Sequence, residues 1–239
     1  MDSRICDMLG IEFPLVAFSH CRDVVVEVSK AGGFGVFGAA TITPEQLEIE
    51  LSWIDEHIDG KPYGVDLILP NKYEGKGEQK SPDEVLAMLP VEHIDFVNGI
   101  LEAHGVSSDD VDDAARRDSM GFANNLSIEG ALGHLDVAFA HPIKLIANAL
   151  GVPPKEMLAR GRQNGVAVAA LVGAKSHALN QVQAGVDILV VAGGEAGGHC
   201  GSVSTMVLVP EIHAAIQDHG DTPILAAGGI VTGRQMAAC

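Results

Sequence analysis

The sequence predicts an α/β protein with the architecture of a (β/α)8 TIM barrel. Short apolar, β-branched runs alternate along the chain with longer amphipathic stretches, as strands alternate with helices in such folds. The runs are apolar throughout, which is typical of parallel strands buried on both faces. Glycine turns follow several of the runs, whereas a doubly wound sheet gathers its glycines at one switch point. The distribution of glycines therefore favours the barrel.

Seven apolar runs predict strands, and five amphipathic stretches between them predict helices. The expected strands are 14–18, 34–38, 63–69, 136–140, 166–172, 187–192 and 223–227. The expected helices are 23–31, 44–58, 154–164, 176–184 and 209–219. A closed barrel needs an eighth strand, which this series lacks. We therefore expect a barrel that is truncated before strand 8.

Residues 70–135 interrupt the alternation, because they carry helix signals but no convincing strand. Helices are expected from Ser81, where proline follows at the first helical position, and over 91–104, 108–117 and 127–134. The barrel would then comprise 1–69 and 136–239, with 70–135 as a helical insertion. Because βα connections lie on the active-site face of a barrel, the insertion is a candidate lid. A solvated embellishment without ligand contact is the alternative.

The composition of the chain disfavours several classes of function. Lys and Arg number 15 against 32 Asp and Glu, a net charge of −17 that disfavours binding to nucleic acid or to anionic membranes. The chain has no apolar run of about 20 residues and no secretory leader, so we expect a cytoplasmic protein. The four cysteines show no metal-binding or disulfide spacing, which predicts no metal site.

Two glycine-rich turns are the candidate functional segments. The turn AAGGI (226–230) presents backbone N–H groups where barrels bind phosphate. The turn GGEAGGHCG (193–201) places His199 in a glycine frame at the end of a predicted strand, where it could act as a general base. Glu195 could orient that histidine or cap the turn. By contrast, Gly33-Phe34-Gly35 leads into a strand, which excludes a dinucleotide fingerprint.

Four segments together resemble the nitronate monooxygenase family and its relative, the flavin-dependent enoyl-acyl carrier protein reductase. They are KAGGFGVFGA, YGVDLIL, VVAGGEAGGHCG and PILAAGGIVTG. The resemblance implies a barrel that binds FMN, with His199 as the catalytic residue and Asp66 where the family usually has an asparagine. It also places Ala17, Phe18, Ser19, Lys175, Gly193, Gly194, Gly197 and Gly198 near the flavin, and Gly228 and Gly229 at its phosphate.

The resemblance implies FMN-dependent oxidation of nitronates or nitroalkanes, with dioxygen as the second substrate. An alternative is an NAD(P)H-dependent reductase of an enoyl thioester or quinone on the same barrel. An alternative of another class is a non-catalytic protein that binds flavin or a phosphate ligand, and a phosphate-sugar isomerase barrel ranks third. Assembly into a homodimer is left open by the sequence.

Overall fold

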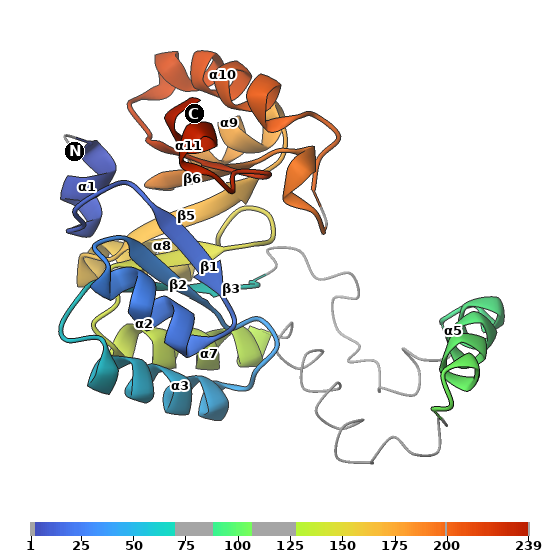
Figure 1. The fold of residues 1–239 in the computed structure, drawn as a ribbon. Coiled ribbons are helices and arrows are strands. Elements are labelled where there is room, and N and C mark those ends of the chain that lie inside the picture. The colour runs from blue at the N-terminus through green and yellow to red at the C-terminus, as the bar shows by residue number, and fades with distance from the viewer. Residues whose placement is uncertain (1–2, 70–87, 107–127, 199, 239) are drawn as a thin grey trace.

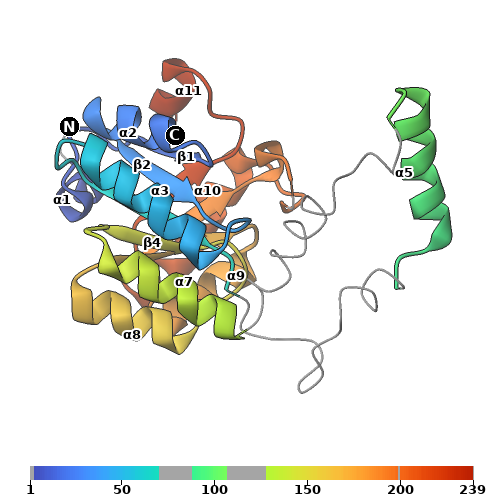
Figure 2. The same ribbon diagram turned by 90° about the horizontal axis from the view of Figure 1, so that it is seen from below.

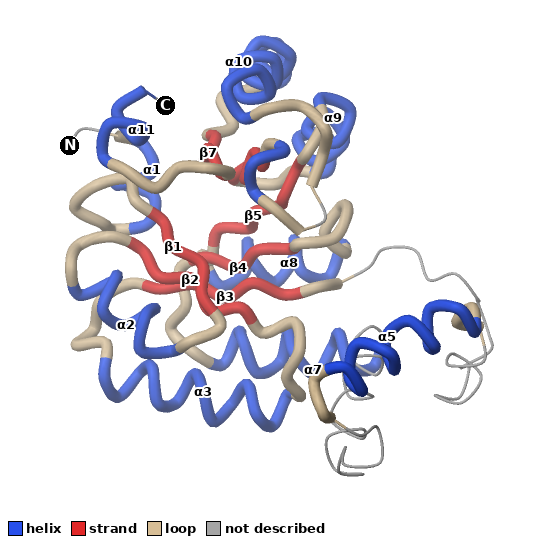
Figure 3. The backbone as a smooth tube through the Cα atoms, turned by 45° about the vertical axis from the view of Figure 1, so that its right-hand side comes forward, coloured by secondary structure: helices blue, strands red, loops and turns tan. Residues whose placement is uncertain are grey.

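The fold is a seven-stranded parallel sheet that curls into a barrel with its helices outside. The computed structural model describes residues 3–69, 88–106, 128–198 and 200–238. The strands are β1 (Val16–Ser19), β2 (Phe34–Gly38), β3 (Tyr63–Leu67), β4 (Leu145–Asn148), β5 (Ala167–Val172), β6 (Ile188–Ala192) and β7 (Ile224–Ala227). They pair in sequence order, each parallel to the next. The curl is visible in Figure 3, and the expected α/β barrel class is confirmed.

The helices mostly follow strands and lie outside the sheet (Figure 1). They are α1 (Arg4–Leu9), α2 (Arg22–Lys30), α3 (Pro44–His57), α5 (Val91–Ala103), α7 (Ile128–Ala140), α8 (Lys155–Asn164), α9 (Lys175–Ala184), α10 (Thr205–Ile216) and α11 (Gly233–Ala238), with short 3-10 turns η2 (Gly194–Ala196) and η3 (Gln217–His219). The start of α3 shows why the sequence sets these bounds. Thr43 Oγ1 accepts a bond from the Gln46 N–H, and Gln46 Oε1 accepts one from the Thr43 N–H.

One predicted strand was wrong. Residues 136–140 form the last turns of α7, and the fourth strand is β4, Leu145–Asn148. The segment DVAFA is apolar enough for a strand, but it continues a helical pattern in which Leu135 and Ala138 are buried. α7 packs against α3 in the barrel's helical layer. The boundary of another element also differs, since α10 begins at Thr205 rather than at residue 209.

Two hydrophobic clusters separate the inside of the barrel from the helical layer. Alternate residues of each strand point to opposite faces, so Tyr63, Val65 and Leu67 of β3 pack outward with the helices. The inner cluster contains Phe34, Val36, Leu145, Ala147, Ala169 and Ile188, together with Ile5, Cys6, Leu9 and Ile11. Helix α1 therefore closes the amino-terminal end of the barrel, and the carboxyl end of the strands is left for ligands.

Only part of the expected insertion lies among the described residues. α5 fits the helix expected over 91–104, and α7 covers the one expected over 127–134. The helices expected from Ser81 and over 108–117 fall outside the described ranges. No residue of α5 is buried, and Figures 1 and 2 show this helix standing apart from the barrel. Within the described ranges, no helix is both long and apolar enough to cross a membrane.

Gly35 lets α2 lie directly against β2. A Cβ atom at this position would meet the Val25 carbonyl oxygen at 2.3 Å, far inside contact distance. The Gly35 N–H donates to Ser29 Oγ at 3.0 Å, and that hydroxyl donates to the Pro62 carbonyl at 2.8 Å. Ser29 thus joins the helix to the starts of two neighbouring strands. The second glycine of the predicted G-x-G turn is therefore a packing residue.

We predict that Gly35→Ala destabilises the protein by about 1–3 kcal/mol or more, because α2 must move away from the sheet to admit the methyl group. Thermal unfolding measures the loss. Gly99→Ala is the matched control, since a Cβ at Gly99 on α5 meets no atom within 4 Å. An unchanged melting temperature for Gly35→Ala would contradict the close packing.

Candidate active site

The carboxyl ends of the strands gather the residues that the sequence singled out. The loops after the strands surround the open end of the barrel, since α1 fills the opposite end. Ala17, Phe18 and Ser19 end β1, Asp66 lies near the end of β3, and the two glycine turns follow β6 and β7. The structure therefore brings most of the predicted site residues to one end of the molecule.

Phe18 covers the end of β2 and remains accessible. Its ring would lie 2.5 Å from a Cβ at Gly38, so a side chain at that position would displace it, and 55% of the Phe18 residue is exposed. An exposed aromatic ring at the mouth of a barrel is a surface on which a flat ligand can stack. Ser19 has a local role, since its hydroxyl accepts the Cys21 N–H at 3.0 Å.

His20 is a site residue that the sequence interpretation missed. Its Nδ1 lies 2.9 Å from the Gly38 carbonyl oxygen, and its ring meets Phe18 edge-on with centroids 5.1 Å apart. The bond to a carbonyl fixes the proton on Nδ1 in the neutral ring and leaves Nε2 as the acceptor. The available signal was its position, one residue beyond the end of β1.

Asp66 is the buried carboxyl group of this end. It is 7% exposed, and its Oδ1 has no hydrogen-bond partner among the described residues. Burial raises the pKa of Asp66 to about 7, because a carboxylate without compensating partners is destabilised in an apolar setting. The nearby Asn148 differs, because its amide is bonded to Leu69 and to the carbonyls of Leu150 and Gly151.

Glu195 and Thr205 join β6, β7 and α10. Glu195 Oε2 accepts the Thr205 N–H at 2.8 Å, and Thr205 Oγ1 lies 3.1 Å from the same oxygen. The hydroxyl is also 3.2 Å from the Ala227 carbonyl and 3.1 Å from that of Gly228. Hydrogen bonding from the Thr205 N–H lowers the pKa of Glu195. Glu195 thus caps the start of α10, and its other expected role, orienting His199, stays a prediction.

The glycines of 193–201 fall into two groups. A Cβ at Gly193 would meet the Thr205 N at 2.3 Å, and one at Gly201 would meet the Gly173 carbonyl at 2.4 Å. These two are required by the packing of loops against each other. Gly197 and Gly198 have φ values of +76° and +66° and open space where a side chain would stand. Close approach of a ligand is therefore possible at Gly197 and Gly198.

The turn after β7 is held by its own side chains. Gly228 and Gly229 have φ values of +107° and +71°, and Cβ atoms there would meet Thr205 Oγ1 at 2.8 Å and Glu195 Cβ at 2.9 Å. Gln235 Oε1 accepts the N–H groups of Val231 and Thr232 at 2.9 and 2.8 Å. Both glycines are needed for the turn itself, and their contact with a phosphate stays a prediction.

The remaining predicted residues lie as follows. His199 falls outside the described residues, so its role as a general base stays a prediction. Its neighbour Cys200 directs Sγ to the Gly194 carbonyl at 3.4 Å. Lys175 Nζ is 3.5 Å from Glu211 Oε1 on α10, which places the ammonium group in the helical layer. Within the described ranges, no group of three or more His, Cys, Asp or Glu side chains could hold a metal ion.

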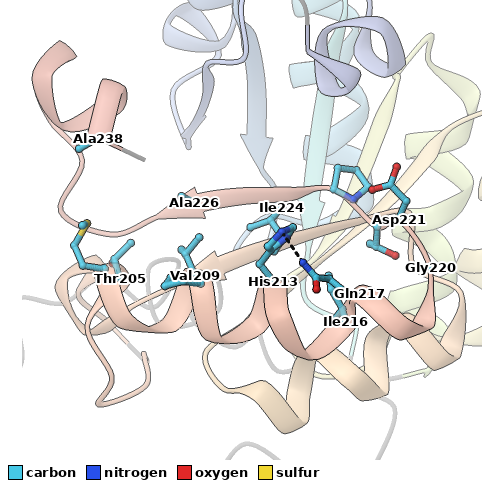
Figure 4. A pocket seen from close by; sticks show the side chains of 14 residues that line it. Thr205, Val209, His213, Ile216, Gln217, Gly220, Asp221, Ile224, Ala226 and Ala238 are labelled. Carbon is cyan, nitrogen blue, oxygen red and sulfur yellow. Dashed lines mark hydrogen bonds between the residues drawn. The ribbon is translucent and has the colours of Figure 1, made fainter.

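A large groove lies elsewhere, between α10 and β7 (Figure 4). Its volume is about 980 Å³. Several residues between Thr205 and Gln217 line one side, and several between Gly220 and Ala226 line the other. Two of the lining residues are hydrogen-bonded to each other, with His213 Nε2 and Gln217 Nε2 3.2 Å apart. Ile224 packs with the outer cluster, whereas Leu225 packs with the inner one. The groove therefore belongs to the outer face of β7 and does not open into the barrel.

Known proteins resemble this chain in sequence and in fold. The nitronate monooxygenase family profile matches residues 2–239. The Mycobacterium tuberculosis protein "Putative monooxygenase Rv1533" is 51% identical over 240 residues, which cover 100% of this chain and 62% of that protein. A "Probable nitronate monooxygenase" of Staphylococcus saprophyticus is 25% identical, covering 100% of this chain and 64% of its own length.

Two solved structures share the fold. A mutant FabK of Thermotoga maritima has a TM-score of 0.68 and 25% identity, covering 100% of this chain and 60% of its own. Nitroalkane oxidase of Streptomyces ansochromogenes has a TM-score of 0.70 and 23% identity, covering 99% and 63%. The chain thus spans less than two thirds of the length of each of these proteins.

We predict that Glu195→Ala lowers the melting temperature by a few degrees at pH 7, because the first N–H of α10 loses its acceptor. The lowered pKa of Glu195 sets the sign of the pH dependence. Its stabilisation is present above the ordinary glutamate pKa of about 4.3 and is lost as the pH falls through the folded-state value. The difference from the parent protein should therefore narrow in acid. Glu27→Ala on the exposed side of α2 is the control, and equal melting temperatures at pH 7 would contradict the cap.

Proposed function

The chain belongs to the nitronate monooxygenase family, and from that premise we propose that the full-length protein is an FMN-dependent oxidoreductase that oxidises alkyl nitronates and nitroalkanes with dioxygen. The observation that carries the proposal is the match of the family profile to residues 2–239, which include both glycine turns. Those turns lie together at the open end of the barrel, where enzymes of this fold bind their substrates.

The residues at this end fit a flat, partly polar cofactor. Phe18 offers an exposed ring, Gly197 and Gly198 offer open backbone, and Asp66 offers a buried oxygen without a partner. We propose that the flavin comes closest to the backbone at Gly197 and Gly198. Gly193 and Gly194 would position the loop, since their N–H groups already bond to the carbonyls of Ala227 and Val203 at 3.2 and 2.8 Å.

The remaining assignments concern the rim of the site. Ala17 and Ser19 would line the flavin beside Phe18, and Gly228 and Gly229 would shape its phosphate site. Lys175 would act from the helical layer, where its partner is Glu211. The insertion that contains α5 would cover the substrate if α5, which stands apart from the barrel here, moved over the open end, where its exposed apolar side chains could make contact.

The chemistry divides between cofactor and protein. FMN supplies the electron acceptance and the reaction with dioxygen. His199 takes the α-proton from a neutral nitroalkane, because an imidazole titrates near neutral pH and can hold that proton. A preformed nitronate has already lost this proton and needs only to be oriented. Comparing the turnover of the two substrates therefore distinguishes proton removal from the later steps.

A second candidate function is reduction of an enoyl thioester or a quinone by NAD(P)H on the same flavin. The observation that favours it is the likeness to FabK, at 25% identity and a TM-score of 0.68. In that reaction His199 would lie by the substrate carbonyl. Rapid reduction of the bound flavin by NADPH, without turnover of a nitronate, would favour this candidate over the first.

We expect the purified full-length protein to be yellow and to release FMN, not FAD, when it is heated. An absorption spectrum with chromatography of the released flavin measures this. The expectation rests on the glycine turns and the family match. A colourless protein that FMN cannot reconstitute would show that the proposed cofactor is wrong.

We predict that His199→Asn lowers the turnover of a neutral nitroalkane by about 10²–10⁴-fold, the usual contribution of a general acid–base group. Oxidation of the preformed nitronate should fall much less, and FMN should stay bound. The control is His177→Asn on the exposed side of α9, which should leave both rates unchanged. Equal losses on both substrates would indicate a binding role instead, and no loss on either would refute the assignment.

A further inference from the structure

Asp66 faces the inside of the barrel near its open end. On β3 the outward positions are Tyr63, Val65 and Leu67, so the side chain of Asp66 lies on the opposite face. Its in-register neighbours are Gly38 on β2 and Ala147 on β4. The space over Gly38 is occupied by the rings of Phe18 and His20, which would lie 2.5 and 2.8 Å from a Cβ at this position. Both rings are exposed, so a ligand that enters the mouth of the barrel reaches Asp66 by displacing them.

Among the described residues, no group donates a hydrogen bond to Asp66 Oδ1. Gly38 and Ala147 carry no polar side chain, and the Asn148 amide N–H groups are directed to carbonyl oxygens. In the described part of the chain, His20 is a titratable side chain on this route, since its ring lies over Gly38 and bonds to its carbonyl. Among the described residues, burial is the cause that raises the pKa of Asp66 to about 7.

A neutral carboxylic acid satisfies this environment better than a carboxylate. It costs less to bury, and it has one O–H donor and one carbonyl acceptor, the same pattern as a side-chain amide. The isoalloxazine edge of a flavin presents carbonyl oxygens and ring nitrogens that accept hydrogen bonds. The unpartnered Oδ1 of Asp66 is the polar atom that such an edge could satisfy.

We propose that Asp66 holds the flavin ring as a neutral carboxylic acid, donating its O–H to an acceptor on the ring edge. This inference rests on the proposed function, because it takes FMN as the ligand. It adds a regulation of the site: the form of the protein that binds FMN carries a proton on Asp66. Binding at alkaline pH must then take up that proton from solution.

The expected pH dependence follows from the neutral fraction of Asp66. With a pKa of about 7, most of the flavin-free protein has a neutral Asp66 at pH 6.5 and an ionised one at pH 8.5. The apparent dissociation constant equals the intrinsic one divided by the competent fraction. For that pKa, the FMN dissociation constant should rise about 25-fold between pH 6.5 and 8.5. The phosphate of FMN, with a second pKa near 6, changes little over the same range.

The experiment titrates flavin-free full-length protein with FMN and follows flavin fluorescence from pH 6.5 to 8.5. Asp66→Asn keeps a donor and an acceptor but cannot titrate, so its affinity should be nearly independent of pH. His20→Gln is the matched control for the neighbouring imidazole and should retain the wild-type slope. Calorimetry of the wild type in buffers of different ionisation enthalpy provides a measurement without a variant. It should show uptake of about one proton per FMN at pH 8.5.

The outcomes separate this inference from the function on which it rests. A wild-type protein that binds no FMN at any pH overturns both. FMN binding with a flat pH profile and no proton uptake overturns the role of Asp66 and leaves the FMN enzyme standing. A slope that disappears in His20→Gln but persists in Asp66→Asn transfers the titration to the imidazole and also overturns the proposal.

Discussion

The constraint on which this structure depends is that all seven strands are parallel and that those between the edge strands β1 and β7 are largely buried on both faces. Their backbone N–H and C=O groups are used between neighbouring strands, so the inside of the barrel presents mainly side chains of the inner cluster. α1 closes one end with Ile5, Cys6 and Leu9. A polar side chain that points inward must therefore find its partner at the other end, where the loops after the strands meet. This is the physical reason why the candidate site has only one location.

At that end, glycine has two different functions within a few residues of sequence. Gly193 and Gly201 allow loops to pack on the start of α10 and on Gly173, where any side chain would collide with backbone. Gly197 and Gly198 instead face open space with left-handed backbone conformations. The first pair makes the loop rigid, and the second leaves it accessible. A ligand would thus meet a backbone surface that is held in place from behind by Glu195 and Thr205.

The sequence predicted six of the strands at nearly their observed positions, because each is an apolar run with a glycine, proline or polar turn beside it. The fourth failed because β4 is a four-residue strand that follows an apolar, alanine-containing helix end, and periodicity over so short a run does not separate the two. The cap made by Glu195 depends on a helix start ten residues later in the chain. His20 was missed because its importance comes from Gly38 on the neighbouring strand, a relation that only the sheet register reveals.

Two carboxyl groups at the same end of the barrel are driven in opposite directions by their surroundings. The Thr205 N–H at the start of α10 lowers the pKa of Glu195, so its charge is retained and is directed at the helix. Burial raises the pKa of Asp66, which keeps that side chain neutral over the lower part of the physiological range. The formal charge of −17 counts both groups as ionised, yet the raised pKa of Asp66 leaves Glu195 as the one of the two that carries its charge at the lower end of this range. Divergent pKa values of this kind are how a site assigns separate roles to like residues.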